Sequence, residues 1–168
     1  MDILYRISWE LVQNTIFRYS PRQFHIYRVA ILKLFGANLM WNTYIYPTVK
    51  IWKPSNLVIG SLSCLGDDVY VYNVGRVIIG RSTTISQRSI LCTAGHDYTT
   101  ESFDLITKNI IIKNHVWVAM NVFISPGVTI EDNCVILPCA CVTSQTVVNS
   151  VYAGVPAKRI KQRFFNGK

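Results

Sequence analysis

A branched apolar residue recurs at every sixth position over most of this 168-residue chain, and this repeat restricts the possible folds more than any other feature. Runs of three begin at positions 39, 59 and 79, and a longer run starts at position 112 after a gap. The repeating residues are Leu39, Ile45, Ile51, Ile59, Leu65, Val71, Ile79, Ile85, Leu91, Ile112, Val118, Ile124, Ile130, Ile136, Val142 and Val148. A helix, with 3.6 residues per turn, cannot produce this spacing, and the simple alternation of a β-strand would not select every sixth residue.

A second set of residues keeps the same period, four positions after most of the repeating apolar residues. Its members are small or β-branched: Thr43, Val49, Ser63, Val69, Thr83, Ser89, Val116, Val122, Val128, Cys134, Ala140 and Thr146. Short strands that each turn one large and one small side chain inward account for both patterns, with coils stacked at about 4.8 Å. We therefore predict an all-β solenoid, a parallel β-helix of triangular cross-section, over residues 37–153.

The segment before the repeat, residues 1–36, has the periodicity of helices. We expect one helix over roughly residues 2–18 whose inward side chains are Ile3, Ile7, Leu11 and Phe17. A second helix is expected to start at Ser20-Pro21 and to stop at Gly36, with a shared face of Phe24, Tyr27, Ile31 and Leu34. One interpretation is a helical cap that shields the open edge of the first coil. The other is a helix pair on a membrane surface, because aromatic residues are mixed with Arg18, Arg22, Arg28 and Lys33.

The formal charge of +8 is concentrated at the two ends of the chain. Residues 1–36 carry five basic and two acidic side chains, residues 154–168 carry five and none, and residues 37–153 carry seven of each. A neutral body argues against nucleic-acid binding, which needs a broad basic surface. The C-terminal charge fits a local anion-binding pocket, or else a solvated tail. We expect the segment after Pro156 to form a short basic helix.

Several features favour a cytoplasmic protein. The five cysteines form no CxxC motif, and the N-terminus lacks the apolar core of an export signal. The uncharged run from Asn133 to Ala157 is long enough to span a bilayer, but it contains Pro138 and Gly154 and keeps the six-residue period. We therefore predict no membrane-spanning segment, and we retain the N-terminal 36 residues as a candidate for peripheral contact with the membrane.

The repeat is interrupted once, by an excursion over residues 92–111 that contains His96. A solenoid can only leave its register at a corner, and loops carry function more often than regular strands do. His25 falls in the helical segment and His115 in a polar corner, so both are interpreted as surface or packing residues. An imidazole titrates near neutral pH and can accept a hydroxyl proton, which makes His96 the candidate general base.

These motifs together resemble the hexapeptide-repeat acyltransferases. The resemblance covers nearly the whole chain and rests on the hexads, GHD at 95–97, ITKNIIIKNHVWVAMNVFISPGVTI at 106–130 and AGVPAKRI at 153–160. It is strongest to the maltose, galactoside and nodulation-factor O-acetyltransferases and to the exopolysaccharide acetyltransferases of the colanic-acid type. YSPRQ at 19–23, ILKLFGAN at 31–38 and DDVYVYN at 67–73 resemble the exopolysaccharide enzymes in particular.

The resemblance implies a left-handed β-helix, a homotrimer with active sites between subunits, and acetyl-CoA as the acyl donor. It also implies a sugar hydroxyl as acceptor, in exopolysaccharide or other surface-glycan synthesis. His96 matches the catalytic histidine of the family. The residues expected against the donor are Ala119, whose backbone would stabilise the oxyanion, and Ala140, Gly154, Pro156, Lys158 and Arg159, the last two pairing with phosphates.

The acceptor contacts are predicted from position. Asp68 and Asn73 lie about one coil before His96, where they either contact the sugar or satisfy their own turns. Asp97 is a further candidate for acceptor binding or for orienting the imidazole. Trp117 either stacks against a substrate or anchors neighbouring coils. We expect direct transfer without an acyl-enzyme, because no G-x-S-x-G motif is present and the cysteines mostly follow the small-residue pattern.

Two other functions remain open from the sequence. A zinc-dependent hydratase of the carbonic-anhydrase type on the same fold would need three ligating histidines, and only His96 and His115 lie in the repeat region. We therefore expect no metal. A non-catalytic solenoid scaffold is the second alternative.

Overall fold

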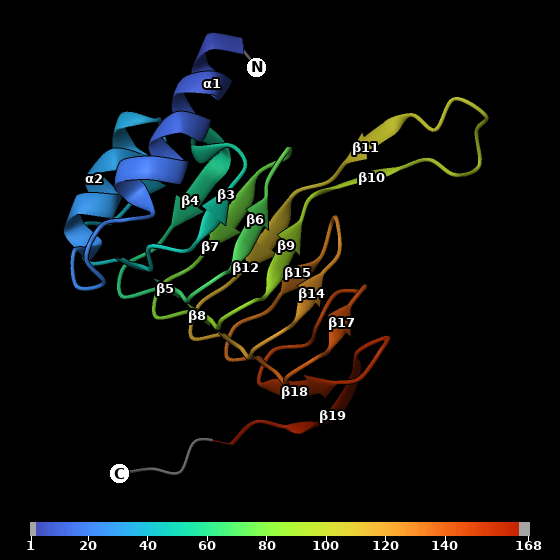
Figure 1. The fold of residues 1–168 in the computed structure, drawn as a ribbon. Coiled ribbons are helices and arrows are strands. Elements are labelled where there is room, and N and C mark those ends of the chain that lie inside the picture. Colours follow the sequence, from blue (N-terminus) through green and yellow to red (C-terminus); the bar gives the residue numbers. More distant parts are fainter. Residues whose placement is uncertain (1–2, 165–168) are drawn as a thin grey trace.

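The computed structural model describes residues 3–164, in which three parallel β-sheets form the sides of one left-handed triangular coil (Figure 1). The first sheet contains β1 (Asn38–Leu39), β4 (Leu57–Ile59), β7 (Val77–Ile79), β12 (Ile110–Ile112) and β15 (Thr129–Ile130). The second contains β2 (Tyr44–Ile45), β5 (Cys64–Leu65), β8 (Thr84–Ile85), β13 (Trp117–Val118), β16 (Val135–Ile136), β18 (Ser150–Ala153) and β19 (Lys158–Gln162). The third contains β3 (Lys50–Ile51), β6 (Tyr70–Tyr72), β9 (Ile90–Cys92), β14 (Phe123–Ile124) and β17 (Cys141–Val142).

Residues of the six-residue repeat stack directly on one another, which confirms the predicted solenoid. Ile59 pairs with Ile79, and Ile112 pairs with both Ile79 and Ile130. Pairing across the gap is therefore in the same register as pairing between regular coils. The repeating side chains are at most 2% exposed, with the exception of the last, Val148, which is 46% exposed. In the final coil, Tyr152 takes the stacking position on Ile136.

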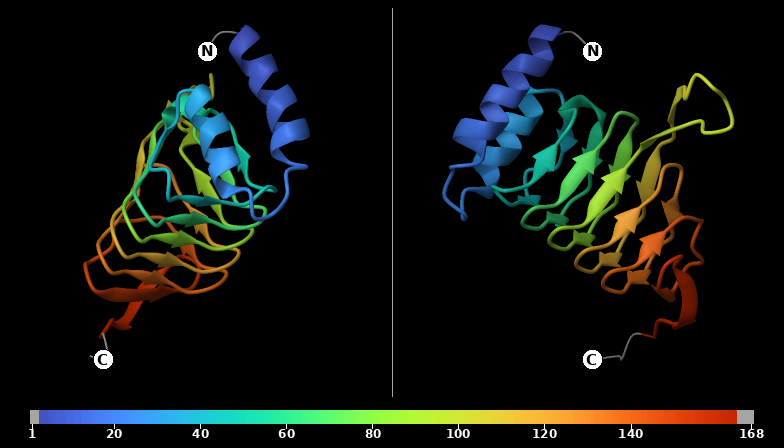
Figure 2. Two further views of the ribbon diagram at one scale, coloured as in Figure 1. Left: turned by 90° about the vertical axis from the view of Figure 1, so that its left-hand side faces the viewer. Right: turned by 45° about the vertical axis from the view of Figure 1, so that its right-hand side comes forward.

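A helical cap covers the end of the solenoid at the first coil (Figure 2). It consists of α1 (Ile3–Val12), a π-helical turn (Gln13–Phe17) and α2 (His25–Leu34), and a short 3₁₀ turn (Pro54–Asn56) follows β3. On β3, the Ile51 carbonyl accepts a hydrogen bond from Trp9 Nε1 at 2.7 Å and the Ile51 N–H donates to Gln13 Oε1 at 2.6 Å. Unpaired strand edges tend to associate with other chains. Side chains of the cap form hydrogen bonds with the edge of β3 and so prevent this.

The other two edges are covered in the same way. The Ile45 carbonyl of β2 accepts from Arg28 Nε at 2.6 Å and lies 2.9 Å from His25 Nδ1. The Leu39 carbonyl of β1 accepts from Lys33 Nζ at 2.8 Å. Arg28 is fully buried, and its remaining N–H groups are bound by the turn that precedes α2. The inner surface of the cap is therefore partly polar, because it must match backbone groups.

This polar inner surface explains why the predicted helix faces were wrong. Ile3, Ile7 and Leu11 were expected inside but are 73%, 58% and 65% exposed, whereas the expected Phe17 is buried. On α2, Ile31 is buried as expected, while the other members of the expected face, Phe24, Tyr27 and Leu34, are exposed. The second helix also starts at His25 rather than at Ser20-Pro21. A hydrophobic pattern places apolar residues inward by default, but here Trp9, Gln13 and Arg28 take the inner positions.

The predicted C-terminal helix was also wrong over its described part. Lys158–Gln162 form β19, which pairs antiparallel with β18. The last coil has an open edge, and a strand can occupy it with backbone hydrogen bonds whereas a helix cannot. Arg163 extends this contact by donating to the carbonyls of His115 and Asn133 at 2.9 and 3.2 Å. Residues 1–2 of the predicted cap and 165–168 of the tail lie outside the described residues. Among residues 3–164, no helix combines the length and apolar character required to cross a bilayer.

The close spacing of coils at one corner leads to a stability prediction. A Cβ at position 80 would lie 2.6 Å from Asn114 Oδ1 and 2.7 Å from the Lys113 backbone. We expect Gly80→Ala to lower the free energy of unfolding by about 1–3 kcal/mol in urea titrations at fixed protein concentration, because the neighbouring coil must move. Gly95→Ala is the matched control, since nothing lies within 4 Å of its Cβ position. Equal effects of the two substitutions would contradict the close-stacking explanation.

Candidate active site

The interruption of the repeat forms an arm that projects from the solenoid (Figures 1 and 2). The arm comprises residues 94–107, in which β10 (Ala94–His96) pairs antiparallel with β11 (Leu105–Thr107). It leaves the third sheet after β9 and returns to the first sheet at β12. Its outer part carries the exposed apolar side chains of Tyr98, Phe103, Leu105 and Ile106. An arm of this shape cannot bury these side chains against its own solenoid.

His96 is exposed at the end of β10, and its ring is oriented by the backbone of the arm. Nδ1 lies 2.6 Å from the carbonyl oxygen of Phe103. A carbonyl only accepts hydrogen bonds, so Nδ1 carries a proton and donates it, and in the neutral ring Nε2 keeps its lone pair. An imidazole held in this tautomer can accept a proton at Nε2.

Asp97 does not orient this imidazole. Its carboxylate Oδ1 accepts from the backbone N–H of Thr99 at 3.0 Å and from the Thr99 hydroxyl at 2.6 Å. These hydrogen bonds lower the pKa of Asp97 below its ordinary value, the hydroxyl having the larger effect. Asp97 therefore shapes the turn at the tip of the arm, and the orienting role predicted for it belongs to the Phe103 carbonyl.

The two residues predicted one coil before His96 have structural positions. Asn73 is fully buried, and its side-chain amide binds both the N–H and the carbonyl of Lys53, at 2.9 and 2.7 Å. It joins two coils and is not accessible to a sugar, so of the two roles considered for Asn73 the structural one agrees with its contacts. Asp68 is exposed at a corner with a φ of 56°, and its backbone N–H donates to the Thr48 hydroxyl at 2.8 Å.

A polar hollow of about 190 Å³ lies on the outer surface of the second sheet. Among the residues that line it, Arg22 donates to Asp67 Oδ2 at 2.8 Å. Asp67 Oδ1 also accepts a hydrogen bond from Thr48, at 3.1 Å. Ser86, another lining residue, accepts a hydrogen bond from Trp117 Nε1 at 3.0 Å, and Trp117 itself is 47% exposed. The hollow thus combines a carboxylate, a guanidinium and hydroxyls beside an exposed indole.

The residues predicted near the donor fall into two groups. Ala119 is 2% exposed, and its N–H already donates to the Ile136 carbonyl at 2.9 Å, so it is not available as the predicted oxyanion donor. Ala140 is 1% exposed and faces the interior of the coil. Both are small inward residues of the repeat. Close packing of the coils explains their small size.

The C-terminal group is accessible. Gly154 has a φ of 93°, and its carbonyl accepts from the N–H of Cys141 at 3.0 Å. Pro156 and Lys158 are exposed beyond this turn. Arg159 is exposed as well, with its Nε donating to the Ser150 hydroxyl at 2.8 Å. A turn beside two exposed cationic side chains can receive an anionic ligand.

Comparison with known proteins identifies the family. A profile of the bacterial transferase hexapeptide (six repeats) matches residues 109–144. The chain is 40% identical over 155 residues to the colanic acid biosynthesis acetyltransferase WcaF of Escherichia coli K12, covering 92% of this chain and 85% of that protein. The chain belongs to the hexapeptide-repeat acetyltransferases.

Other relatives agree with this assignment. The acetyltransferase is 31% identical over 138 residues to the galactoside O-acetyltransferase of Escherichia coli K12, covering 80% of this chain and 68% of that protein. A galactoside acetyltransferase solved in complex with coenzyme A superimposes with a TM-score of 0.80 at 25% identity, covering 95% and 80% of the two chains. A maltose O-acetyltransferase from Clostridium difficile 630 has the same fold, with a TM-score of 0.85 at 22% identity over 98% and 90%.

Sequence reasoning missed the hollow of this acetyltransferase. Asp68 was chosen for its position about one coil before His96, and its neighbour Asp67 was not named. Asp67 lines the hollow together with Arg22, which comes from the cap 45 residues earlier. The hollow also contains Cys64, whose pKa is raised to about 11 mainly by burial, so its thiol stays protonated at neutral pH.

No cluster of three or more His, Cys, Asp or Glu side chains that could hold a metal ion occurs within residues 3–164 of the acetyltransferase. His25 binds the edge of β2 and His115 lies at a corner with a φ of 55°. Neither approaches His96 in a group of possible ligands.

The contact with Phe103 predicts the tautomer of the catalytic candidate. In ¹⁵N-labelled protein, the neutral ring of His96 should carry its proton on Nδ1, because the Phe103 carbonyl accepts it at 2.6 Å. Long-range ¹H–¹⁵N correlation spectra distinguish the two ring nitrogens, and comparison with the His96→Gln variant assigns the signal. A neutral ring protonated on Nε2 would show that the arm does not hold the imidazole in this orientation.

Proposed function

We propose that this acetyltransferase transfers the acetyl group of acetyl-CoA to a sugar hydroxyl during the synthesis of an exopolysaccharide or another surface glycan. The observation that carries the proposal is the orientation of His96, whose Nδ1 is held by the Phe103 carbonyl and whose Nε2 is free to accept a proton. Relatives that act on galactosides or in colanic acid biosynthesis support the choice of a carbohydrate acceptor.

The proposed reaction is direct. Nε2 of His96 removes the proton of the sugar hydroxyl as its oxygen attacks the thioester carbonyl carbon, and a tetrahedral oxyanion forms. When the oxyanion collapses, the carbon–sulfur bond breaks, the imidazolium returns its proton to the leaving thiolate, and the products are an acetyl ester and free coenzyme A. The protonated state of Cys64 supports a route without an acyl-enzyme.

The proposed active site lies between subunits of a homotrimer. The arm holds His96 away from its own solenoid and exposes Tyr98, Phe103, Leu105 and Ile106, of which Tyr98 is 84% exposed. Apolar side chains grouped in this way are typical of a surface that packs against another protein. The solenoid of a second copy would cover them and would bring a donor groove to His96.

The polar hollow is the proposed site for the acceptor. An aromatic ring beside a few fixed polar groups is suited to a sugar, whose C–H face stacks on the ring while its hydroxyls form hydrogen bonds. Trp117 supplies the ring, and Asp67 and Ser86 supply an acceptor and a hydroxyl. The ion pair with Arg22 and the hydrogen bond from Thr48 hold the Asp67 carboxylate in one position in the lining of the hollow.

Substitution of His96 tests the proposed base. His96→Ala should lower kcat by a factor on the order of 10²–10⁴, with acetyl-CoA affinity changed little, because the imidazole acts on the hydroxyl and not on the nucleotide. Acetylated product is measured by mass spectrometry over a panel of glycans, and donor binding by calorimetry. Asp97→Asn, which alters the same arm without removing the base, is the matched control and should retain most of the activity. A His96→Ala enzyme with unchanged kcat would refute the mechanism.

The cationic end of the chain is the proposed site for the donor phosphates. Replacing both Lys158 and Arg159 with alanine should raise the Kd for coenzyme A by at least about tenfold at low salt, and by less at high salt, because screening weakens the lost ion pairs. The control variant, Arg76→Ala with Arg88→Ala, also removes two positive charges, but from exposed positions on the solenoid. It should leave the Kd for coenzyme A unchanged. Equal effects of the two double variants would assign the loss to overall charge.

A further inference from the structure

The helical cap presents an apolar surface outward as well as inward. On α1, Ile3, Ile7 and Leu11 follow one another at spacings of four residues, on the side opposite the buried Trp9. On α2, Ile26 and Leu34 are 67% and 84% exposed, on the side opposite the buried helix residues. Both helices therefore carry an exposed apolar stripe in addition to the face that covers the first coil.

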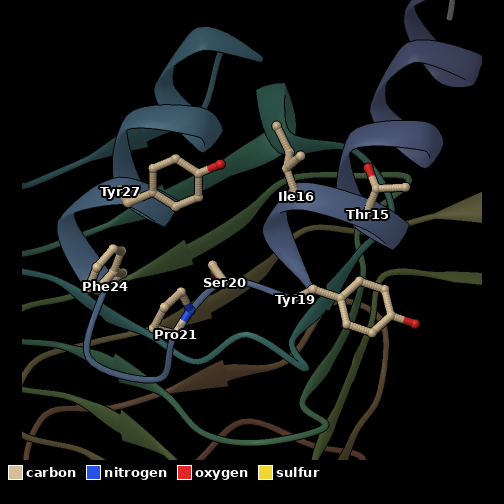
Figure 3. A pocket seen from close by; sticks show the side chains of 7 residues that line it. All are labelled: Thr15, Ile16, Tyr19, Ser20, Pro21, Phe24 and Tyr27. Carbon is tan, nitrogen blue, oxygen red and sulfur yellow. The ribbon is translucent and has the colours of Figure 1, made fainter.

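A groove continues this surface where the two helices are joined (Figure 3). It has a volume of about 450 Å³ and is lined mainly by Ile16, Tyr19, Pro21, Phe24 and Tyr27. Phe24 and Tyr27 come from the α2 side and Ile16 and Tyr19 from the α1 side; the Tyr27 hydroxyl points toward Ile16 and the Tyr19 hydroxyl points away from the other lining residues. Tyr19 is 81% exposed. Tyrosine side chains, which combine an apolar ring with a hydroxyl that can bind water, are typical of surfaces at a membrane–water boundary.

The positive charge of the cap indicates what kind of partner fits its outward surface. Residues 3–36 contain five Lys and Arg and a single acid, Glu10, which is paired with Arg6 at 3.1 Å. Of these basic side chains, Arg28 is buried and Arg22 is paired with Asp67, whereas Arg18 is exposed at the turn that carries Tyr19. Because its basic side chains outnumber its acidic ones, the cap matches an anionic surface better than it matches a second copy of itself. Anionic headgroups complement the basic side chains, and the apolar stripes match the acyl region beneath them.

We propose that the outward surface of the cap docks on an anionic phospholipid bilayer, with Ile7, Leu11 and the Tyr19–Tyr27 groove entering the headgroup boundary. The contact is peripheral, since no helix within residues 3–164 can cross the bilayer. Arginine side chains at the edge of the surface extend toward the headgroups while their stems remain in the apolar layer. The proposal concerns the cap alone and does not depend on the chemistry of the arm.

Co-sedimentation with vesicles tests the proposal on the full-length protein. We expect binding to vesicles of phosphatidylglycerol and phosphatidylcholine, and much weaker binding to phosphatidylcholine alone. Ile7→Ser with Leu11→Ser should reduce the membrane partition coefficient by at least about tenfold. The reason is that burying one such apolar side chain in the boundary raises that coefficient by about a factor of ten. Val147→Ser with Val148→Ser is the matched control: these residues are 53% and 46% exposed at the other end of the solenoid, and binding should be unchanged.

Two further measurements separate the alternatives. The His96→Ala enzyme should bind vesicles as the wild type does, so loss of catalysis and loss of docking are distinguished. The oligomeric state of the Ile7→Ser, Leu11→Ser variant, measured by light scattering with its melting temperature, should equal that of the wild type. A smaller assembly in this variant would show that the surface contacts another copy, and that result would overturn the proposal. Equal binding to vesicles by the wild type and the cap variant would overturn it as well.

Discussion

The direct stacking of one coil on the next is the constraint on which the rest of the molecule depends. Each inward branched side chain lies on its counterpart one coil away, as Ile59 does on Ile79 and Ile79 on Ile112. Parallel backbone ladders and a continuous apolar interior are formed together, so a coil cannot shift without losing both. The arm can therefore leave and re-enter the stack only in register. The rigid coils on either side hold the arm, and with it His96, in a fixed position.

A stack of coils has two open ends, and both are closed by hydrogen bonds to backbone groups. At the first coil, Trp9, Gln13 and Arg28 bind the free groups of the strands, and at the last coil β19 adds a strand. These contacts explain the distribution of charge and apolar surface. The cap turns some polar side chains inward among its buried apolar ones and leaves other apolar side chains outside. The C-terminal strand places Lys158 and Arg159 beside the Gly154 turn.

The solenoid and the position of its interruption could be predicted from the sequence, since a six-residue period has few structural explanations and His96 stands where it breaks. The helix faces could not, because Gln13 and Arg28 face inward to satisfy strand edges that have no signature in the sequence of the helices. For the same reason the C-terminal helix was predicted where an edge strand forms. In the candidate site, Asn73 and Ala119 were selected by position, but each has its hydrogen-bonding groups committed to a neighbouring coil. Asp67 was missed because its partner Arg22 is distant in sequence.

The central claim is that the stack is interrupted so that the imidazole of His96 can act as a base at the boundary with another subunit. A crystal structure of the assembled enzyme with coenzyme A and a glycan acceptor tests this most directly. The account predicts Nε2 of His96 within hydrogen-bond distance of the acceptor hydroxyl, close to the coenzyme A sulfur, in a groove formed by two subunits, with Nδ1 still bound to the Phe103 carbonyl. An imidazole remote from both ligands, or turned toward its own coil, would contradict it.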